Sequence, residues 1–410
     1  MVFAGIPPSV TQWFSGFAQG VMDNGWIILF YLLIILVIYL NRKKFMFEAK
    51  IIAMYRAKWG IPLMERIGKK HAELVKMIAL VGIGVGFVGM VAIVYYMLSG
   101  IYSALFVPSA PATFSLVIPG VKIPGSPIVV PFWYGIISLF IVVVIHEFCH
   151  GVVASAYKLK VQSTGIVFFG PLIGAFVEPD EKELQKRDDI TQMSLFAAGP
   201  FSNIILAGIL ALLLIGVFNP LQADMVAFKG VSFDSIQDGY PAMNASVQAN
   251  VRYSVVNGQP IRDSSEFITV LNCAKPGEAV TLATRNESHI ILTTQNPSDP
   301  KKAYLGVIGI NSEYDLKDDA AWYKIAFETL MIWNTLLQWI IILSLGIGLA
   351  NLLPLGPVDG GRMIQLALMR VKGQDKGMRY WKTLSIVVGV IILFLIIVPI
   401  LKATLFKSFF

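Results

Sequence analysis

Residues 142–151, VVVIHEFCHG, place two histidines and a glutamate inside a run that is otherwise as apolar as a membrane span. His146 and His150 are four residues apart, so in a helix both imidazoles lie on one face and can reach the same metal ion. Glu147 is rotated from His146 by about 100°, which puts its carboxylate beside the ion, where it could accept a proton from a bound water. The stretch therefore predicts a metal site on a buried helix.

A pair of core histidines with satisfied hydrogen bonds is the alternative reading of this stretch. This alternative is disfavoured by the free energy of burying polar groups in the membrane. An uncompensated carboxylate near mid-membrane costs on the order of 3 kcal/mol, and two more polar groups add to that. The chain has 4 histidines, and His146 and His150 occupy this spacing. We therefore expect a metal ion here.

The composition of the chain indicates an integral membrane protein. Of 410 residues, 56% are hydrophobic and 14% are charged, which is far more apolar than a soluble enzyme of this size. The net charge of +7 comes largely from short basic loops beside apolar segments, where it sets topology, so we expect no nucleic-acid partner.

Cys149 and Cys273 form neither a disulfide framework nor a metal knuckle. Residues 1–24 lack Lys and Arg, so the first apolar segment is expected to stay as an anchor.

The predicted fold class is an α-helical polytopic membrane protein with about six transmembrane helices. A span needs roughly 20 mostly apolar residues. The qualifying segments are 25–40, 77–99, 131–157, 191–217, 326–350 and 383–405.

The distribution of basic residues orients these spans. The loop 41–76 is rich in Lys and Arg, whereas 100–130 contains only Lys122, so 41–76 is predicted to be cytoplasmic. Alternation then places 158–190 and 352–382 in the cytoplasm, and both termini and 218–324 outside. Counting helical rise from Pro131, His146 lies roughly 22 Å into a core of about 30 Å. The metal site is thus expected within the membrane, near its cytoplasmic face.

Residues 219–312 change character and predict a soluble, mostly β insert. They contain turn signals such as Asn257-Gly258 and a helix-like stretch at 263–271, and their order resembles a PDZ domain. Such a domain would offer a groove for an extended peptide; the alternative is a lid or spacer that binds nothing. We accordingly divide the chain into two N-terminal spans (1–100), a first catalytic half (101–218), the PDZ-like insert (219–312) and a second catalytic half (313–410).

The third metal ligand is expected to be a carboxylate. A catalytic zinc usually has three protein ligands and an open position for water, and His71 and His289 lie in a basic loop and in the insert. Residues 351–362, NLLPLGPVDGGR, supply Asp359 where Pro354 and its neighbours break the fifth span. Broken backbone at membrane depth is tolerated where it lines a cavity. The alternative is that Asp359 merely caps a short helix beginning at Gly360.

These motifs together resemble the site-2 protease family of intramembrane zinc metalloproteases. The resemblance rests on the HExxH, on the N-x-x-P-x-x-x-x-D-G pattern that begins at Asn351, and on Gly199-Pro200-Phe201-Ser202-Asn203. It covers about 131–217 and 326–405, with the insert between them, and leaves the first two spans without a role.

The resemblance implies one Zn²⁺ bound by His146, His150 and Asp359, with Glu147 as general base. Asn351 would steady the oxyanion or the substrate backbone, and Asn203 would assist with the substrate or make an ordinary helix-helix hydrogen bond. A re-entrant β segment at 161–178 would pair with an unwound substrate; a simple connecting hairpin is the alternative. The implied substrate-binding residues are Asn203, Gly174, Ala175, Phe176, Val177 and Pro354.

The activity implied is that of a membrane-embedded zinc metalloendopeptidase. Its substrates would be single-pass transmembrane proteins in the lipid bilayer, in some cases already trimmed by another protease. One rival is a membrane zinc protease of the prenyl-protein processing type, with Glu178, Glu181 or Glu183 as third ligand. Another is a non-catalytic receptor or scaffold whose PDZ-like domain captures peptides and whose zinc is structural. Substrate identity and oligomeric state are left open by the sequence.

Overall fold

The computed structural model describes residues 25–48, 52–107, 112–126, 128–169, 172–297 and 299–405. They belong to two compact units, which we describe separately. The first unit contains the described residues up to Leu212 and those from Thr335 onward, and the second contains Leu213–Asn334. The candidate site lies entirely in the first unit.

Five helices of the described residues are long and apolar enough to cross a membrane. They are α4 (Ala72–Phe106), α5 (Phe132–Ala156), α7 (Asp189–Leu213), α11 (Ala321–Asn351) and α13 (Gln374–Leu405). Helix α7 continues through a π-helical turn, η2 (Leu214–Phe218), into α8 (Asn219–Met225). These five match the predicted second to sixth spans.

The predicted first span corresponds to α2 (Gly25–Leu40), which has 16 described residues. At about 1.5 Å per residue this helix extends roughly 24 Å, less than a hydrocarbon core of about 30 Å. The total of six spans therefore stays a prediction.

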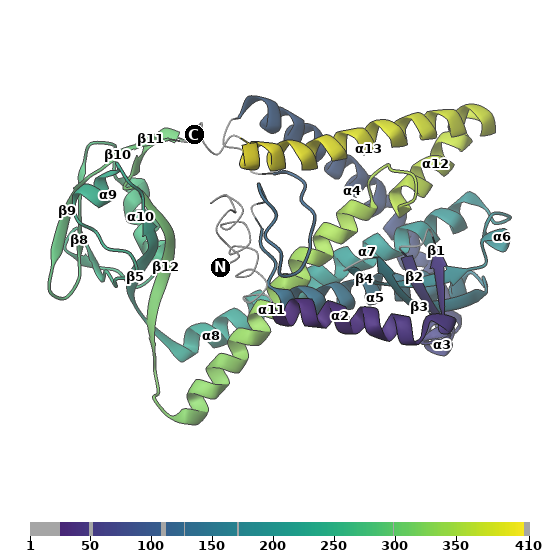
Figure 1. Ribbon diagram of the computed structural model, residues 1–410, viewed down its shortest axis with the longest axis horizontal. Coiled ribbons are helices and arrows are strands. Elements are labelled where there is room, and N and C mark those ends of the chain that lie inside the picture. The colour runs from purple at the N-terminus through teal and green to yellow at the C-terminus, as the bar shows by residue number, and fades with distance from the viewer. Residues whose placement is uncertain are drawn as a thin grey trace, which may run out of the picture. The chain divides into compact units, whose positions relative to one another are not determined.

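A four-stranded antiparallel sheet accompanies the helices of the first unit (Figure 1). Its strands are β1 (Phe45–Glu48), β2 (Ile52–Ala57), β3 (Val161–Phe169) and β4 (Leu172–Pro179), in the spatial order β1-β2-β3-β4. Of residues 161–178, which are predicted to form a β segment, the described ones lie in β3 and β4, and these two strands pair antiparallel. Two strands come from the basic segment 41–76, which we expected only as a loop. Strand β4 is an edge strand, and it packs against α5.

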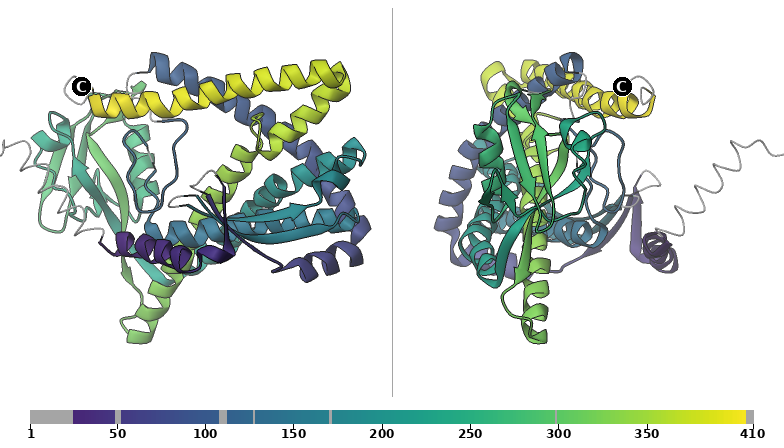
Figure 2. Two further views of the ribbon diagram at one scale, coloured as in Figure 1. Left: turned by 45° about the vertical axis from the view of Figure 1, so that its right-hand side comes forward. Right: turned by 90° about the vertical axis from the view of Figure 1, so that its left-hand side faces the viewer.

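Shorter helices complete the first unit. They are η1 (Arg42–Lys44), α3 (Ile61–Lys70), α6 (Glu181–Leu184) and α12 (Asp359–Lys372). Helices α12 and α13 form a helical hairpin (Figure 2), in which Trp381 Nε1 donates to the Gly361 carbonyl at 2.8 Å. Leu352, in the segment after α11, and Met363, on α12, are fully buried in the same apolar cluster as Met90 of α4. This packing fixes the broken segment between α11 and α12.

The second unit contains a β-rich part between α8 and α11. Its strands are β5 (Val226–Ile236), β6 (Val255–Val256), β7 (Gln259–Pro260), β8 (Ala279–Ala283), β9 (Ser288–Leu292), β10 (Thr294–Asn296), β11 (Asp299–Tyr304) and β12 (Val307–Leu316), with helices α9 (Pro241–Asn244) and α10 (Ser264–Cys273). They form a sheet β7-β6-β8-β9 and two pairs, β5–β12 and β10–β11.

Local sequence explains several features of this second unit. Asn257 and Gly258 both have positive φ, 50° and 75°, as a tight hairpin turn between β6 and β7 requires. The Asp263 side chain accepts from the Glu266 N–H and caps α10, which matches the helix-like stretch at 263–271. Phe233 contacts both Tyr253 and Phe267 at ring-centroid distances of 5.6 and 5.5 Å, and all three are buried. A β-rich unit is therefore present, while its PDZ identity stays a prediction.

Candidate metal centre

Helix α5 carries both histidines on one face. The apolar run that precedes them buries Val142 completely, and His146 is only 5% exposed. The two imidazole centroids are 4.9 Å apart. The i, i+4 spacing thus brings the rings together in the manner that the sequence predicts.

Asp359 reaches these histidines because α11 ends at Asn351. A non-helical segment follows, and α12 begins at Asp359 itself, with Val358 in the N-cap position. The close packing of α12 on this segment requires glycine at 360, because a Cβ there would collide with the main chain of Leu352. The Asp359 carboxylate faces α5, where it lies beside His146.

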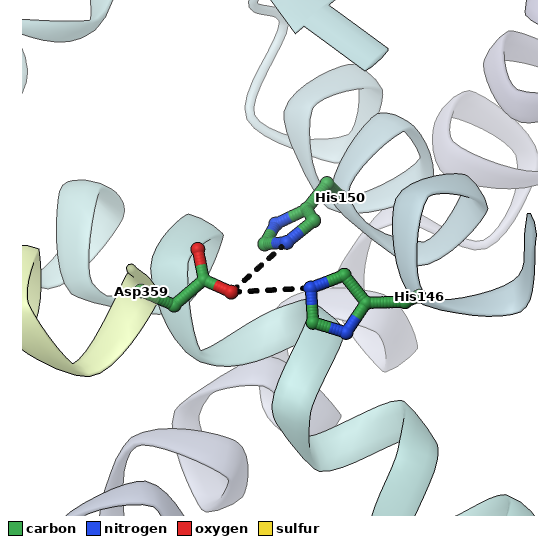
Figure 3. Close-up of side chains that lie close together, drawn as sticks. All are labelled: His146, His150 and Asp359. Carbon is green, nitrogen blue, oxygen red and sulfur yellow. Dashed lines mark hydrogen bonds and ion pairs between the residues drawn. The ribbon is translucent and has the colours of Figure 1, made fainter. Parts of the chain in front are cut away.

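The three side chains converge on one point (Figure 3). Asp359 Oδ2 lies 3.2 Å from His146 Nε2 and 3.5 Å from His150 Nε2. One ligand atom from each residue fits within 4.8 Å of the others. Two ligands at about 2.0–2.1 Å from a tetrahedral zinc are roughly 3.4 Å apart, so this donor set fits the ion.

The space beside the imidazoles depends on Gly199 of α7. A Cβ at this position would collide with Nε2 of both His146 and His150. Glycine therefore keeps open the volume next to the two nitrogen atoms that face Asp359. This is a second observation, independent of the donor set, that fits a bound ion.

The other nitrogen of each imidazole has a partner on α7. His150 Nδ1 lies 2.7 Å from the main-chain oxygen of Leu195. His146 Nδ1 lies 3.1 Å from Nδ2 of Asn203. Metal-binding histidines usually have such a partner on the ring nitrogen that does not bind the metal, and it fixes the ring orientation.

Glu147 lies between the histidines and strand β4. Its Oε2 accepts a hydrogen bond of 2.9 Å from the Val177 main-chain N–H. The N–H of Val177 therefore points away from β3 and toward α5. Because main-chain groups alternate in direction along a strand, the N–H and C=O of Ala175 also face this outer edge.

A cavity of about 900 Å³ opens over the site. Its lining includes His146, Glu147, His150, Asp359, Asn351 and Arg362. Asp180 lies at the rim, where hydrogen bonds from the Glu183 N–H and the Gln162 side chain lower its pKa. Charged and polar side chains thus surround the metal ligands on this side.

The other predicted site residues fall into two groups. Asn351, Phe176 and Val177 line the cavity. Gly174 and Ala175 are on β4 but are not among the described lining residues, and Pro354 is buried in the segment after α11. Asn203 is buried behind His146.

The glutamates considered as alternative ligands are paired with arginines. Glu178 pairs with Arg56 at 3.1 Å, Glu181 with Arg362 at 3.0 Å, and Glu183 with Arg187. Among the described residues, the group with ligand spacing is His146, His150 and Asp359. The geometry therefore favours an aspartate as third ligand.

Sequence reasoning does not find the contacts made by Leu195 and Arg362. The Leu195 contact is through its main-chain carbonyl. Every residue type has this group, so the amino acid at position 195 does not indicate the contact. Arg362 follows Asp359 by three residues, and helical spacing could have placed both on one side of α12.

Comparisons with known proteins agree with this geometry. The model of peptidase family M50 matches residues 134–396, a range that contains both histidines and Asp359. An uncharacterized protein of Methanocaldococcus jannaschii is 25% identical over 234 residues. That alignment covers 57% of this chain and 56% of the relative, so the chain spans little more than half of the relative's length.

Proposed function

This multi-pass membrane protein belongs to peptidase family M50, metalloproteases of the site-2 protease kind, and we propose that it hydrolyses peptide bonds within or near transmembrane segments of single-span proteins. The family resemblance drawn from the sequence motifs is thereby confirmed. The observation that carries the proposal is the convergence of His146, His150 and Asp359 beside the carboxylate of Glu147.

His146, His150 and Asp359 would hold one zinc ion. When bound, zinc supplies a Lewis acid that polarises a carbonyl and lowers the pKa of water to about 7. All three side chains line the cavity, so a substrate in it would lie next to the ion.

Glu147 would act as the general base. Its carboxylate projects from the residue after His146, at the wall of the cavity. There it would accept a proton from the attacking water and deliver that proton to the leaving amine. Asn351 lines the same cavity, and its amide N–H would donate to the carbonyl oxygen as negative charge develops.

The edge of β4 would hold the substrate backbone. A transmembrane helix buries its peptide groups in internal hydrogen bonds, so it must unwind before attack, and the freed groups need partners in a water-poor site. The outward N–H and C=O groups of Ala175 and the C=O of Val177 would supply them by strand addition. Since Val177 is bonded to Glu147, a strand added here would lie within reach of the general base.

Several finer points of the proposal come from the sequence. The site is placed near the cytoplasmic face, and the second unit and both termini outside, by the distribution of Lys and Arg. The second unit would bind an extended peptide or filter substrates by size before they reach the site. Substrates already shortened by another protease would pass such a filter.

The decisive experiment compares the parent protein with Glu147→Gln. The purified protein is reconstituted with a model single-span substrate, and both cleavage and bound zinc are measured. We expect Glu147→Gln to retain zinc and to lose activity by at least 10²-fold, in the range for a general base. Turnover that survives in this variant would refute the role given to Glu147. A parent protein that binds zinc and cleaves no membrane substrate would favour the scaffold alternative.

A further inference from the structure

The Asn203 side chain is buried where no substrate can touch it. Its exposed fraction is 0%, and its Nδ2 lies 3.1 Å from Nδ1 of His146. Within the described parts of the chain, its Oδ1 is also buried and has no hydrogen-bond partner. A buried polar atom without a partner is uncommon in a folded protein and requires an explanation.

The protonation of the His146 imidazole determines whether the oxygen or the nitrogen of the Asn203 amide must face it. A neutral imidazole carries one N–H and one lone pair. Nε2 is the nitrogen that faces Asp359 Oδ2, so its lone pair is needed for the ion. Nδ1 must then carry the proton, and its neighbour must be an acceptor. An amide nitrogen cannot accept, whereas the orphan Oδ1 can.

A half turn about the Cβ–Cγ bond of Asn203 removes the mismatch at His146 Nδ1 and places Nδ2 where Oδ1 now lies. The oxygen and nitrogen of an amide have nearly the same shape, so the turn exchanges them with little change in position. Oδ1 would then lie where Nδ2 now lies, 3.1 Å from His146 Nδ1, which is within the range of an N–H···O hydrogen bond.

His150 shows the same arrangement with a different partner. Its Nδ1 lies 2.7 Å from the Leu195 carbonyl, which can only accept, so Nδ1 carries the proton and the Nε2 lone pair is free. With Oδ1 of Asn203 turned toward His146, the two ligands would have identical tautomers. One is set by the main chain of α7 and the other by a side chain of the same helix.

Asn203 is itself held in place by α11. Ser344 Oγ donates to the Asn203 main-chain oxygen at 2.8 Å, and both residues are fully buried. Gly348 lets the two helices approach closely, because a Cβ there would lie 3.2 Å from the Asn203 Cβ. Neither contact involves the Asn203 amide, so the helix packing and the contact with His146 can be separated experimentally.

We propose that Asn203 is a positioning residue of the metal centre: its side-chain oxygen accepts from His146 Nδ1–H and holds this ligand in the tautomer that binds the ion. The role rests on the proposed function, because it assumes that His146 binds zinc. It differs from the contact with substrate that the sequence alone suggests for Asn203, since here the residue acts only through His146.

The test measures the zinc dissociation constant of the full-length protein in detergent, by competition with a chromophoric chelator. Asn203→Leu keeps the size of the side chain and removes the acceptor, so we expect zinc binding to weaken by about 10–100-fold. Asn203→Asp restores an acceptor at the same place, and it should bind zinc about as tightly as the parent. Ser344→Ala, the control for helix packing, should leave zinc affinity unchanged.

The outcomes separate the role of the Asn203 amide from helix packing and from the proposed function. Unchanged affinity in Asn203→Leu would overturn the proposal. So would a loss in Asn203→Asp as large as that expected for the leucine variant, a result that is informative even if Asn203→Leu does not fold. An equal loss in Ser344→Ala would show that helix packing, and not the amide, supports His146. A parent protein that binds no zinc would refute the proposed function instead.

Discussion

The candidate metal site requires glycine at position 199, because there is no space for a larger side chain beside the imidazoles. The residue lies on α7, and a Cβ there would occupy space next to the Nε2 atoms of both His146 and His150. The nearest atoms to such a Cβ all belong to these two histidines. We therefore propose that this glycine is part of the metal centre, although it contributes no ligand.

We expect Gly199→Ala to weaken zinc binding by roughly 100-fold or more, beyond the 10–100-fold that is usual for changes behind the ligands. The added methyl group would displace one or both imidazoles. Gly208→Ala is a matched control on the same helix, because a Cβ at 208 has no atom within 4 Å. Zinc content of the two purified variants decides the matter, and equal zinc in both would contradict this role for Gly199.

The outer edge of β4 is the element that we propose binds the substrate. In the antiparallel hairpin β3–β4, Ala175 lies opposite Ile166 and Val177 lies opposite Thr164, so these two residues of β4 turn their main-chain groups the same way. The hydrogen bond from Val177 to Glu147 shows that this direction is toward α5. An edge strand tolerates proline where its N–H does not take part in the ladder.

Ala175→Pro should therefore keep the fold and slow cleavage, because it removes one N–H that the substrate needs. We expect a loss of about tenfold, equivalent to roughly 1.4 kcal/mol for a hydrogen bond in a water-poor site. Ala175→Ser retains the N–H and should cleave like the parent. Zinc content should be unchanged in both variants. Parent-like cleavage by Ala175→Pro would exclude strand addition at this position.

Across the chain as a whole, the candidate metal centre brings together segments that are distant in sequence. His146 and Asp359 are 213 residues apart, and their side chains come from α5 and from the start of α12. An ion bound by both would stabilise the folded protein over the unfolded chain by about 2.7 kcal/mol at a concentration 100 times its dissociation constant.

Chelation should accordingly lower the thermal unfolding midpoint of the parent protein, and added zinc should restore it. Asp359→Ala should show a low midpoint that neither treatment changes. Intrinsic fluorescence in detergent provides the measurement. If the chelator removes zinc from the parent protein and the unfolding midpoint does not change, the structural link between α5 and α12 is contradicted.

The predicted orientation can be tested with the native cysteines. Cys273, in the second unit, is exposed, whereas Cys149 is half-buried on the metal-binding helix. If residues 218–324 lie outside, a membrane-impermeant maleimide should label Cys273 in intact cells. Cys273→Ser should abolish that labelling. Labelling that requires permeabilised cells would reverse the orientation.

The amino-acid sequence alone was enough to predict the features that depend on local periodicity and composition. The i, i+4 spacing of His146 and His150 on one helix face and five of the six predicted spans follow from such patterns. The β segment at 161–178 is expected from the family resemblance, together with the glycines that interrupt the apolar run there. The irregular segment before Asp359 follows in the same way, because the prolines and glycines there break the helix, although Asp359 as a ligand stays a prediction. Each of these depends on neighbours within a few residues.

Other features arise only from contacts between segments that are far apart in the chain. Strands β1 and β2 join β3 across more than 100 residues, and short alternating runs such as IAMYRA at 52–57 do not reveal their partner. The acceptor for His150 is a backbone carbonyl, and every residue has one. The clash that excludes a side chain at 199 exists only once α7 packs on α5. Local patterns specify elements, whereas packing specifies which atoms of those elements meet.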